Sequence, residues 1–168
     1  KCVQEGWDPQ NGHPRVLPIF QSTTFAYDSA QTLGRLFDLQ EEGHFYTRLS
    51  NPTLEAVEKK IASLEGGVGA MLTSSGQAAN LIAVLNICPA GGHMICASAV
   101  YGGTFNLFNK TLREMGVEVT FIDADAPDEM IEPLIQDNTK CIFGETLSNP
   151  SLCVFDIERF ANLAHPHG

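Results

Sequence analysis

The sequence predicts an α/β fold in which helices cover both faces of a mostly parallel sheet. From about residue 68 onward, short apolar runs typical of buried strands alternate with longer segments of helical apolar periodicity. Turn-forming pairs such as Gly91-Gly92 and Asp137-Asn138 separate these segments. Strands that alternate with helices run parallel, because each helix returns the chain to the same end of the sheet.

The first 52 residues lack this alternation and are expected to form an N-terminal arm and a loop. Residues 1–27 show little helical periodicity and are interrupted by four residues that break regular structure: Pro9, Gly12, Pro14 and Pro18. This segment is predicted to be extended or irregular. A short helix is predicted at 30–39, and a loop at 43–50.

A longer helix is predicted to begin at Asn51-Pro52. Asn is a favourable N-cap, and Pro is well suited to the first helical position. The following apolar residues have helical spacing: Leu54, Val57, Ile61 and Leu64. Gly66-Gly67 then ends the helix.

Four strands and four helices are predicted after this point. The strands are expected near residues 68–73, 93–97, 117–122 and 140–145. The helices are expected near residues 77–88, 104–115 and 128–136, with a last one beginning near Asp156. In a parallel sheet, ligands bind outside the carboxyl ends of the strands, so residues at those ends are the candidates for function.

Composition narrows the class of protein. The chain has 168 residues, of which 43% are hydrophobic and 18% charged, as expected of a folded domain or part of a larger one. A net charge of -10 argues against nucleic acid or an anionic membrane as a general partner. No apolar stretch approaches the length of a bilayer-spanning helix, so no membrane partner is expected.

The cysteines indicate a reducing compartment. The five residues are Cys2, Cys88, Cys96, Cys141 and Cys153, and no two of them form a C-x-x-C pair. Three lie inside apolar runs, which favours structural thiols in a cytoplasmic protein over disulfides or a metal site. His165 and His167 are two residues apart, a spacing that is poor evidence for metal ligands, so no metal is expected.

The turn before the helix at 77–88 predicts a site for an anion. It contains Ser74, Ser75 and Gly76 and leads directly into the helix, so backbone amides, hydroxyls and the helix dipole can act on one anion. The same residues equally fit an ordinary serine N-cap of a core helix. A dinucleotide fingerprint is disfavoured, because the glycines at 66, 67 and 69 precede the predicted strand instead of opening a helix.

Two further strand ends carry residues suited to a ligand. After the second strand, Tyr101-Gly102-Gly103-Thr104 would allow an aromatic ring to lie against a planar ligand, although such a tyrosine is more often a packing residue. After the fourth, residues 145–150 place Asn149 in a polar loop, where Asn-Pro alone usually marks a turn. A planar, phosphorylated, oxygen-bearing ligand would use all three segments, and pyridoxal 5'-phosphate has that shape.

Four strings together make the sequence resemble the Cys/Met-metabolism family of fold-type I pyridoxal-phosphate enzymes. They span residues 46–53 (YTRLSNPT), 74–79 (SSGQAA), 101–104 (YGGT) and 145–150 (ETLSNP). The resemblance covers nearly the whole chain. It implies that residues 1–52 are an arm and an inter-subunit loop, and that 53–168 are the first part of the pyridoxal-phosphate-binding domain.

The resemblance also implies roles for individual residues. Ser75 and the amides of Gly76 and Gln77 would hold the cofactor phosphate, which Tyr46 and Arg48 would reach from a neighbouring subunit of a dimer or tetramer. An arginine matches phosphate oxygens well, whereas without the resemblance Arg48 is best explained as a solvated charge. Tyr101 would stack on the pyridine ring and act in catalysis by moving a proton. Asn149 would bind the 3-oxygen of the ring, with Glu145 as a support residue.

The resemblance leaves part of the chemistry outside this chain. The lysine that forms a Schiff base with the cofactor, and the aspartate that pairs with its pyridine nitrogen, would follow residue 168. The lysines present are Lys1, Lys59, Lys60, Lys110 and Lys140, and none has the matching context. The sequence is therefore expected to be the N-terminal part of an enzyme subunit.

Within the family, Gln77 and residues 101–108 most resemble the O-acetylhomoserine sulfhydrylase branch. Such an enzyme is a transferase that eliminates acetate from O-acetylhomoserine and adds sulfide or a thiol in its place, in methionine biosynthesis. Methionine gamma-lyase or cystathionine lyase or synthase chemistry is the alternative on the same scaffold. A non-catalytic binding or interaction module is the alternative of another class.

Overall fold

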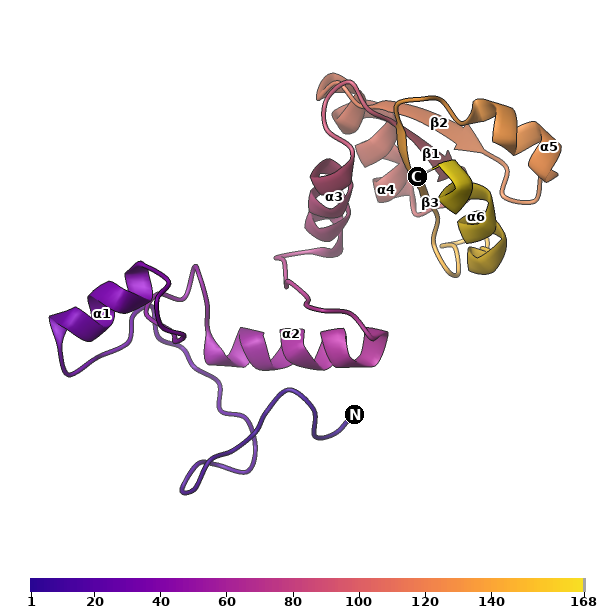
Figure 1. Cartoon of the computed structure of the whole chain (residues 1–168). Coiled ribbons are helices and arrows are strands. Elements are labelled where there is room, and N and C mark those ends of the chain that lie inside the picture. The colour runs from indigo at the N-terminus through magenta and orange to yellow at the C-terminus, as the bar shows by residue number, and fades with distance from the viewer. Residues whose placement is uncertain (168) are drawn as a thin grey trace. The chain divides into compact units, whose positions relative to one another are not determined.

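The computed structural model of the protein describes residues 1–167 (Figure 1). Its contacts divide the chain into two compact units, Lys1–Leu72 and Thr73–Gly168. The sequence predicts that the cofactor-binding domain starts at residue 53. The structure does not test this boundary, which stays a prediction. Gly168, the last residue of that predicted domain, lies outside the described residues.

The first unit contains two helices, both at predicted places. Helix α1 spans Ala30–Phe37, and α2 spans Pro52–Glu65. Asn51 caps α2 as expected, since its Oδ1 accepts a hydrogen bond of 2.9 Å from the amide of Thr53. Gly66 ends α2 with a left-handed φ of 69°, which glycine adopts without steric cost.

The arm of residues 1–27 is irregular, as predicted, and packs along α2 within the unit. The amide of Phe20 donates to Thr53 Oγ1 over 2.9 Å, and the ammonium of Lys1 donates to the carbonyl of Ser63 over 2.8 Å. At Gly6 a Cβ would lie 2.0 Å from the carbonyl oxygen of Ala56, so only glycine allows this approach.

The predicted strand at 68–73 is wrong. Residues 68–72 have no regular structure, and the apolar side chains of Val68 and Met71 are exposed. A strand requires a neighbour for its backbone hydrogen bonds, and none of the described residues pairs with this segment. The amide of Leu72 instead donates to Glu58 Oε1 of α2 over 2.8 Å.

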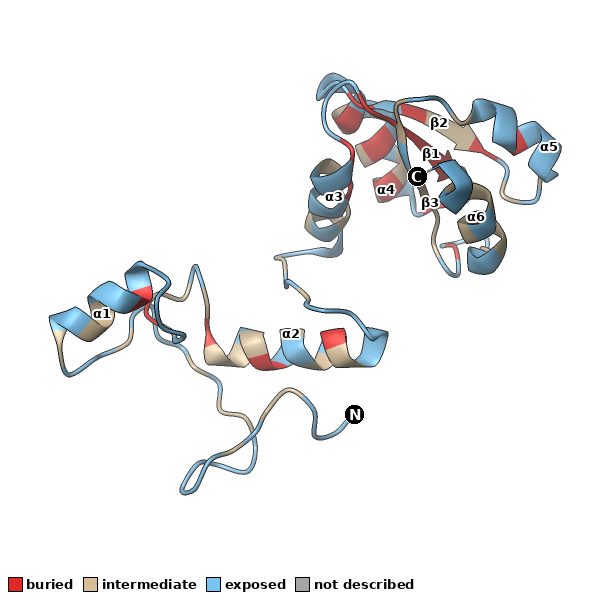
Figure 2. Ribbon diagram, in the orientation of Figure 1, coloured by how far each residue is buried: buried red, intermediate tan, exposed pale blue. Residues whose placement is uncertain are grey.

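The other three predicted strands form the sheet of the second unit. Strands β1 (His93–Ala97), β2 (Glu118–Ile122) and β3 (Thr139–Phe143) are all parallel, in the order β2-β1-β3. All five residues of the central strand β1 are buried, as Figure 2 shows. A parallel sheet is thereby confirmed, with its carboxyl ends meeting at one edge.

One face of the sheet is covered by the helices that precede and follow β1. Met94 and Cys96 point to this face, where they pack with residues of α3 (Gly76–Ile87). Helix α4 (Gly102–Asn106) covers the same face and continues as a π-helical segment, η1 (Leu107–Leu112). The core of the second unit lies mainly here.

The opposite face is covered by α5 (Asp128–Ile131) and α6 (Ile157–Ala164). Ile95 points to this side, because successive strand residues face opposite ways, and it packs against Ile131 and Phe160. Helices on both faces of the sheet, as predicted, are therefore confirmed.

The predicted helix at 128–136 is divided where a proline occurs. After α5, the chain forms a 3-10 turn, η2 (Glu132–Leu134), that contains Pro133. Proline lacks the backbone N–H that continues an α-helix, so the regular helix ends before it. A similar short turn, η3 (His165–His167), contains Pro166 and follows α6.

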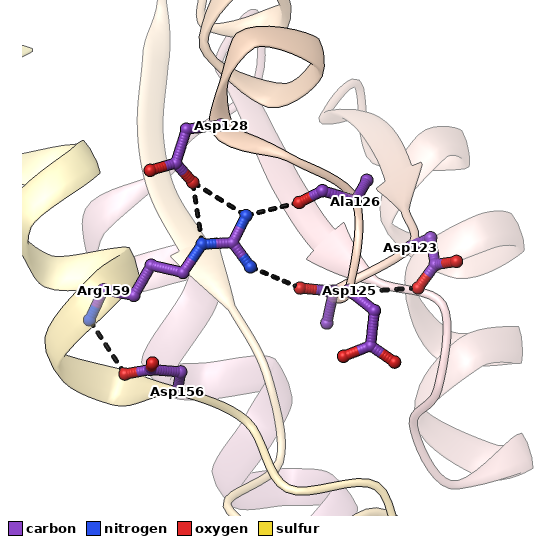
Figure 3. Close-up of polar contacts among 7 residues, drawn as sticks. Asp123, Asp125, Ala126, Asp128, Asp156 and Arg159 are labelled. Carbon is purple, nitrogen blue, oxygen red and sulfur yellow. Dashed lines mark hydrogen bonds and ion pairs between the residues drawn. The ribbon is translucent and has the colours of Figure 1, made fainter.

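Arg159 of α6 fixes the loop that follows β2 (Figure 3). Its guanidinium donates to Asp128 Oδ1 over 2.7 Å, to the carbonyl of Ala124 over 2.8 Å, and to the carbonyl of Ala126. Asp156 caps α6 by accepting the amide of Arg159 at 3.0 Å. One side chain thus satisfies two loop carbonyls and one carboxylate, a role that the sequence did not reveal.

All five cysteines are free thiols. Burial raises the pKa of Cys96 to about 12 and that of Cys141 to about 11, so both stay protonated and unreactive at neutral pH. This agrees with the structural role predicted for thiols in apolar runs. Within residues 1–167, no helix is both long and apolar enough to cross a membrane.

Candidate functional site

The first turn of α3 contains the residues predicted to bind an anion, Ser75, Gly76 and Gln77, which are called the anion cup below. Ser75 is the N-cap: its Oγ accepts from the amide of Ala78 at 3.1 Å, and its carbonyl accepts from Ala79 at 3.0 Å. The two amides between them belong to Gly76 and Gln77, which have no acceptor within the helix. A Cβ at Gly76 would meet nothing within 4 Å, so this side of the turn is open.

The side chain of Gln77 joins the anion cup to α4. Its Nε2 donates to Thr104 Oγ1 over 3.1 Å, and Asn80 Nδ2 donates to the same oxygen over 3.3 Å. Thr104 is buried, and Gln77 Oε1 is also buried, without a hydrogen-bond partner among the described residues. This role of Thr104 is not evident from the sequence, although the residue stands in the Tyr-Gly-Gly-Thr string.

Tyr101 lies at the start of α4 with its ring against the helix. A Cβ at Gly103 would lie 2.5 Å from Tyr101 Cε1, so the ring occupies the space that any other residue at 103 would need. About half of Tyr101 is exposed. The arrangement leaves aromatic surface available to a planar ligand.

Glu145 connects Tyr101 to Asn149. Its Oε1 accepts a hydrogen bond of 2.9 Å from the amide of Tyr101, and its Oε2 accepts one of 3.4 Å from the amide of Asn149. Tyr101 follows β1 and Asn149 follows β3, so one carboxylate joins two neighbouring strand ends. The sequence predicted a support residue here, and these contacts give it definite partners.

The loop that carries Asn149 is organised around Ser148, which is buried. The amide of Ser148 donates to the carbonyl of Cys153 over 2.9 Å, and the amide of Cys153 donates back to Ser148 Oγ over 2.9 Å. A contact of 2.7 Å joins the hydroxyls of Ser148 and Ser151. These bonds hold the loop while Asn149 itself remains exposed.

Tyr46 and Arg48 lie together on a loop of the first unit. The guanidinium carbon of Arg48 is 5.3 Å from the centre of the Tyr46 ring, and Arg48 is exposed. Thr47, between these two residues, fixes the loop by two hydrogen bonds. Its amide donates to the carbonyl of Thr23 over 2.9 Å, and Asn51 Nδ2 donates to Thr47 Oγ1 over 3.1 Å. A defined loop therefore presents the arginine.

The ends of this loop are joined by His44. Its Nδ1 is 3.0 Å from Ser50 Oγ, and its Nε2 is 3.3 Å from Glu55 Oε2 of α2. A hydrogen bond from Lys59, which lies 2.9 Å from Glu55, lowers the pKa of that carboxyl below its ordinary value. The loop is thus attached to the first turn of α2 through charged and polar contacts.

The structure therefore brings together five of the predicted site residues within the second unit: Ser75, Gly76, Gln77, Tyr101 and Asn149. The other two, Tyr46 and Arg48, are neighbours within the first unit. Free amides for a phosphate, an exposed aromatic ring and an amide side chain for an oxygen are a set of groups that fits pyridoxal phosphate. The assignment of each residue to the cofactor stays a prediction.

Comparison with known proteins agrees with this chemistry. The family model described as "Cys/Met metabolism PLP-dependent enzyme" matches residues 1–168. The O-acetyl-L-homoserine sulfhydrylase of Corynebacterium glutamicum is 48% identical over 90% of this chain. The L-methionine gamma-lyase of Treponema denticola is 43% identical, also over 90% of this chain.

A solved structure shares the fold. A Campylobacter jejuni protein described as an O-acetylhomoserine (thiol)-lyase, with N'-pyridoxyl-lysine-5'-monophosphate in its structure, superposes with a TM-score of 0.87 and 34% identity over 96% of this chain. The chain spans 35% and 38% of the length of the two relatives above, and 40% of the solved one.

Proposed function

Because the chain belongs to the Cys/Met metabolism family of PLP-dependent enzymes, we propose that the whole protein is an O-acetylhomoserine sulfhydrylase. It replaces the acetoxy group of O-acetylhomoserine with sulfide or a thiol, giving homocysteine or methionine and releasing acetate. The similarity to the sulfhydrylase of C. glutamicum, at 48% identity, supports this choice of substrate.

One observation carries the proposal: two side chains join the three segments predicted to bind the cofactor. Gln77 links the anion cup to Thr104 over 3.1 Å, and Glu145 links Tyr101 to Asn149. The segments are far apart in sequence, and an ordinary N-cap or turn does not require these links. A ligand with a phosphate, a ring and a ring oxygen would contact all three segments at once.

The cofactor phosphate is held by the amides of Gly76 and Gln77 and by the hydroxyl of Ser75, at the positive end of the α3 dipole. Arg48 and Tyr46 reach the same phosphate from a neighbouring subunit, which makes the working protein a homo-oligomer, a dimer or tetramer. The exposure of Arg48 supports this role, because an arginine that binds across an interface must project from its own unit.

When bound, pyridoxal phosphate supplies an electron sink for the substrate amino acid. The Tyr101 ring orients the cofactor by stacking, and its phenolic oxygen moves a proton during elimination. Asn149 holds the 3-oxygen of the pyridine ring. Each of these roles uses a group that is exposed at the carboxyl edge of the sheet.

Methionine gamma-lyase is the second candidate, because the T. denticola lyase is 43% identical over the same share of the chain. The two candidates separate in an assay of the full-length, cofactor-loaded protein. We expect homocysteine from O-acetylhomoserine and sulfide, and little ammonia or 2-oxobutanoate from methionine alone. Efficient breakdown of methionine without a thiol-transfer reaction would identify the lyase instead.

A cytoplasmic location belongs to the same proposal. The free and partly buried thiols suit a reducing compartment, and the substrates are small soluble molecules. Fractionation of the native cells with an antibody against the protein tests this. Neither nucleic acid nor a membrane is expected as a partner.

A further inference from the structure

We propose that Glu145 is a positioning residue that couples the proton-transfer group Tyr101 to the ring anchor Asn149. The inference rests on the proposed function, since it assigns the reason why these two residues hold their places. In the structure the coupling consists of two hydrogen bonds to one carboxylate, 2.9 Å from the amide of Tyr101 and 3.4 Å from the amide of Asn149.

The chemistry of the contact explains why a glutamate is needed. The two bonds go to different oxygens of Glu145, so the side chain must offer two acceptors at once. A glutamine of the same length would offer one acceptor and one donor, and its donor would face an amide that also donates. An aspartate is one methylene shorter and cannot span the same two amides from the same backbone position.

Tyr101 depends on this contact because its own helix does not hold its amide. Tyr101 is the N-cap of α4, and its side chain makes no capping hydrogen bond. The Tyr101 ring is in close contact with Gly103, which limits how it can tilt, so movement of the backbone at 101 moves the ring as a whole. Glu145 therefore sets the height of the ring above the edge of the sheet.

Asn149 is tied to the same point from the other side. Ser148 and Cys153 close the loop by hydrogen bonds of 2.9 Å, and Glu145 fixes the exposed residue that follows Ser148. Within residues 1–167, the carboxylate of Glu145 forms no ion pair. Its two carboxylate oxygens accept from these two backbone amides, and charged acceptors make the stronger hydrogen bonds.

The test uses the full-length, cofactor-loaded enzyme and the variant Glu145→Gln, with Glu118→Gln as the matched control. Glu118 is an exposed glutamate at the amino end of β2, away from the carboxyl edge. We expect Glu145→Gln to lower kcat about 10- to 100-fold at saturating cofactor and substrate, because small misplacements of a catalytic group have effects of this size. Glu118→Gln is expected to retain the wild-type kcat.

A double-mutant cycle with Tyr101→Phe separates positioning from loss of folded protein. If Glu145 acts through the Tyr101 phenol, Glu145→Gln lowers kcat less than threefold further in the Tyr101→Phe background. A full 10- to 100-fold loss in that background, or an unchanged kcat in the single variant, overturns the proposal.

A second cycle distinguishes this inference from the choice of substrate. The affinity for pyridoxal phosphate and the absorption of the bound cofactor are measured for Glu145→Gln with and without Asn149→Ala. We expect Glu145→Gln to weaken affinity and shift absorption only where Asn149 is present. If this dependence on Asn149 is found in a protein that is inactive towards O-acetylhomoserine, the proposed reaction is wrong and the positioning role is supported. If the two substitutions change cofactor affinity and absorption independently, the positioning role is wrong.

Discussion

The side-chain amide of Gln77 donates a hydrogen bond of 3.1 Å to the buried hydroxyl of Thr104. This bond ties the first turn of α3 to α4, whose N-cap is Tyr101. The backbone amide of Gln77, together with that of Gly76, is proposed to bind the cofactor phosphate. The same residue thus connects the anion cup and the aromatic ring.

Replacement of Thr104 by valine is therefore expected to affect both stability and cofactor binding. Thr104→Val removes the oxygen that accepts from Gln77 and Asn80, leaving both amides without that partner. We expect a loss of about 1–3 kcal/mol in the free energy of unfolding, measured by urea denaturation, together with weaker binding of pyridoxal phosphate. Thr104→Ser keeps the hydroxyl and is the control, for which cofactor affinity is expected to stay close to wild type.

Arg48→Ala is expected to weaken cofactor affinity more than it slows turnover of the saturated enzyme. Contacts to the phosphate are the same in the ground state and the transition state, so they contribute uniform binding. A charge-assisted contact of this kind corresponds to about a tenfold or larger loss of affinity. Titration of cofactor into the full-length protein measures it, with Arg15→Ala as an exposed-arginine control of the same unit.

Mixed oligomers are expected to reveal that Arg48 acts across an interface. Subunits with Arg48→Ala and subunits with Tyr101→Phe, dissociated and reassembled together at limiting cofactor, should be more active than either variant alone. Such mixtures restore some sites in which both residues are wild type. If the mixtures have only the average activity of the two variants, Arg48 serves its own subunit.

Tyr101→Phe is expected to have the opposite pattern to Arg48→Ala. The ring and its contact with Gly103 remain, so cofactor stays bound, but the phenol that moves a proton is lost. General acid–base groups contribute about 10²–10⁴ in rate, which sets the expected fall in kcat. Normal turnover of this variant at saturating cofactor would show that Tyr101 is only a stacking platform.

The apolar patterns and turn residues of the sequence correctly predicted the strands that pair with a neighbouring strand in the structure. Strand β1 was predicted at its observed bounds, because its apolar run lies between clear turns. The strand at 68–73 failed because pattern alone does not reveal whether a neighbour is present. The candidate site residues came from motifs, whereas the links through Thr104 and Glu145 depend on side-chain geometry between segments distant in sequence.

Arg159 illustrates the same limit and gives a prediction for stability. Its contacts with Ala124, Ala126 and Asp128 join α6 to the loop after β2, about 30 residues earlier in the chain. We expect Arg159→Lys to be destabilised by about 1–3 kcal/mol, since lysine cannot donate in three directions from one plane. Urea denaturation measures this, with Arg15→Lys at an exposed arginine as a comparison. If Arg159→Lys is as stable as the wild type, the loop after β2 is held by other contacts.

His93 is fully buried at the start of β1, where its protonation makes the stability of the protein depend on pH. Its Nδ1 is 2.7 Å from Thr139 Oγ1 of β3, and its Nε2 is 2.9 Å from Thr120 Oγ1 of β2. Neutral imidazole has one donor and one acceptor, which two hydroxyls can satisfy. Burial lowers the pKa of His93 below its ordinary value, while the charge of Glu118 acts in the opposite direction.

Because the pKa of His93 is lower in the folded protein, the unfolded chain binds the proton more readily. Its contribution to stability is therefore complete above about pH 6.5, the ordinary histidine pKa, and is lost as the pH falls from there towards the folded value. We expect this loss to approach 1.4 kcal/mol per pH unit within that window. Urea denaturation of the wild type and of His93→Gln between pH 7.5 and pH 5 measures it, with the exposed His165→Gln as control. The wild type and the control should lose stability more steeply than His93→Gln as the pH falls. Three parallel pH profiles would show that the pKa of His93 is the same in the folded and unfolded protein.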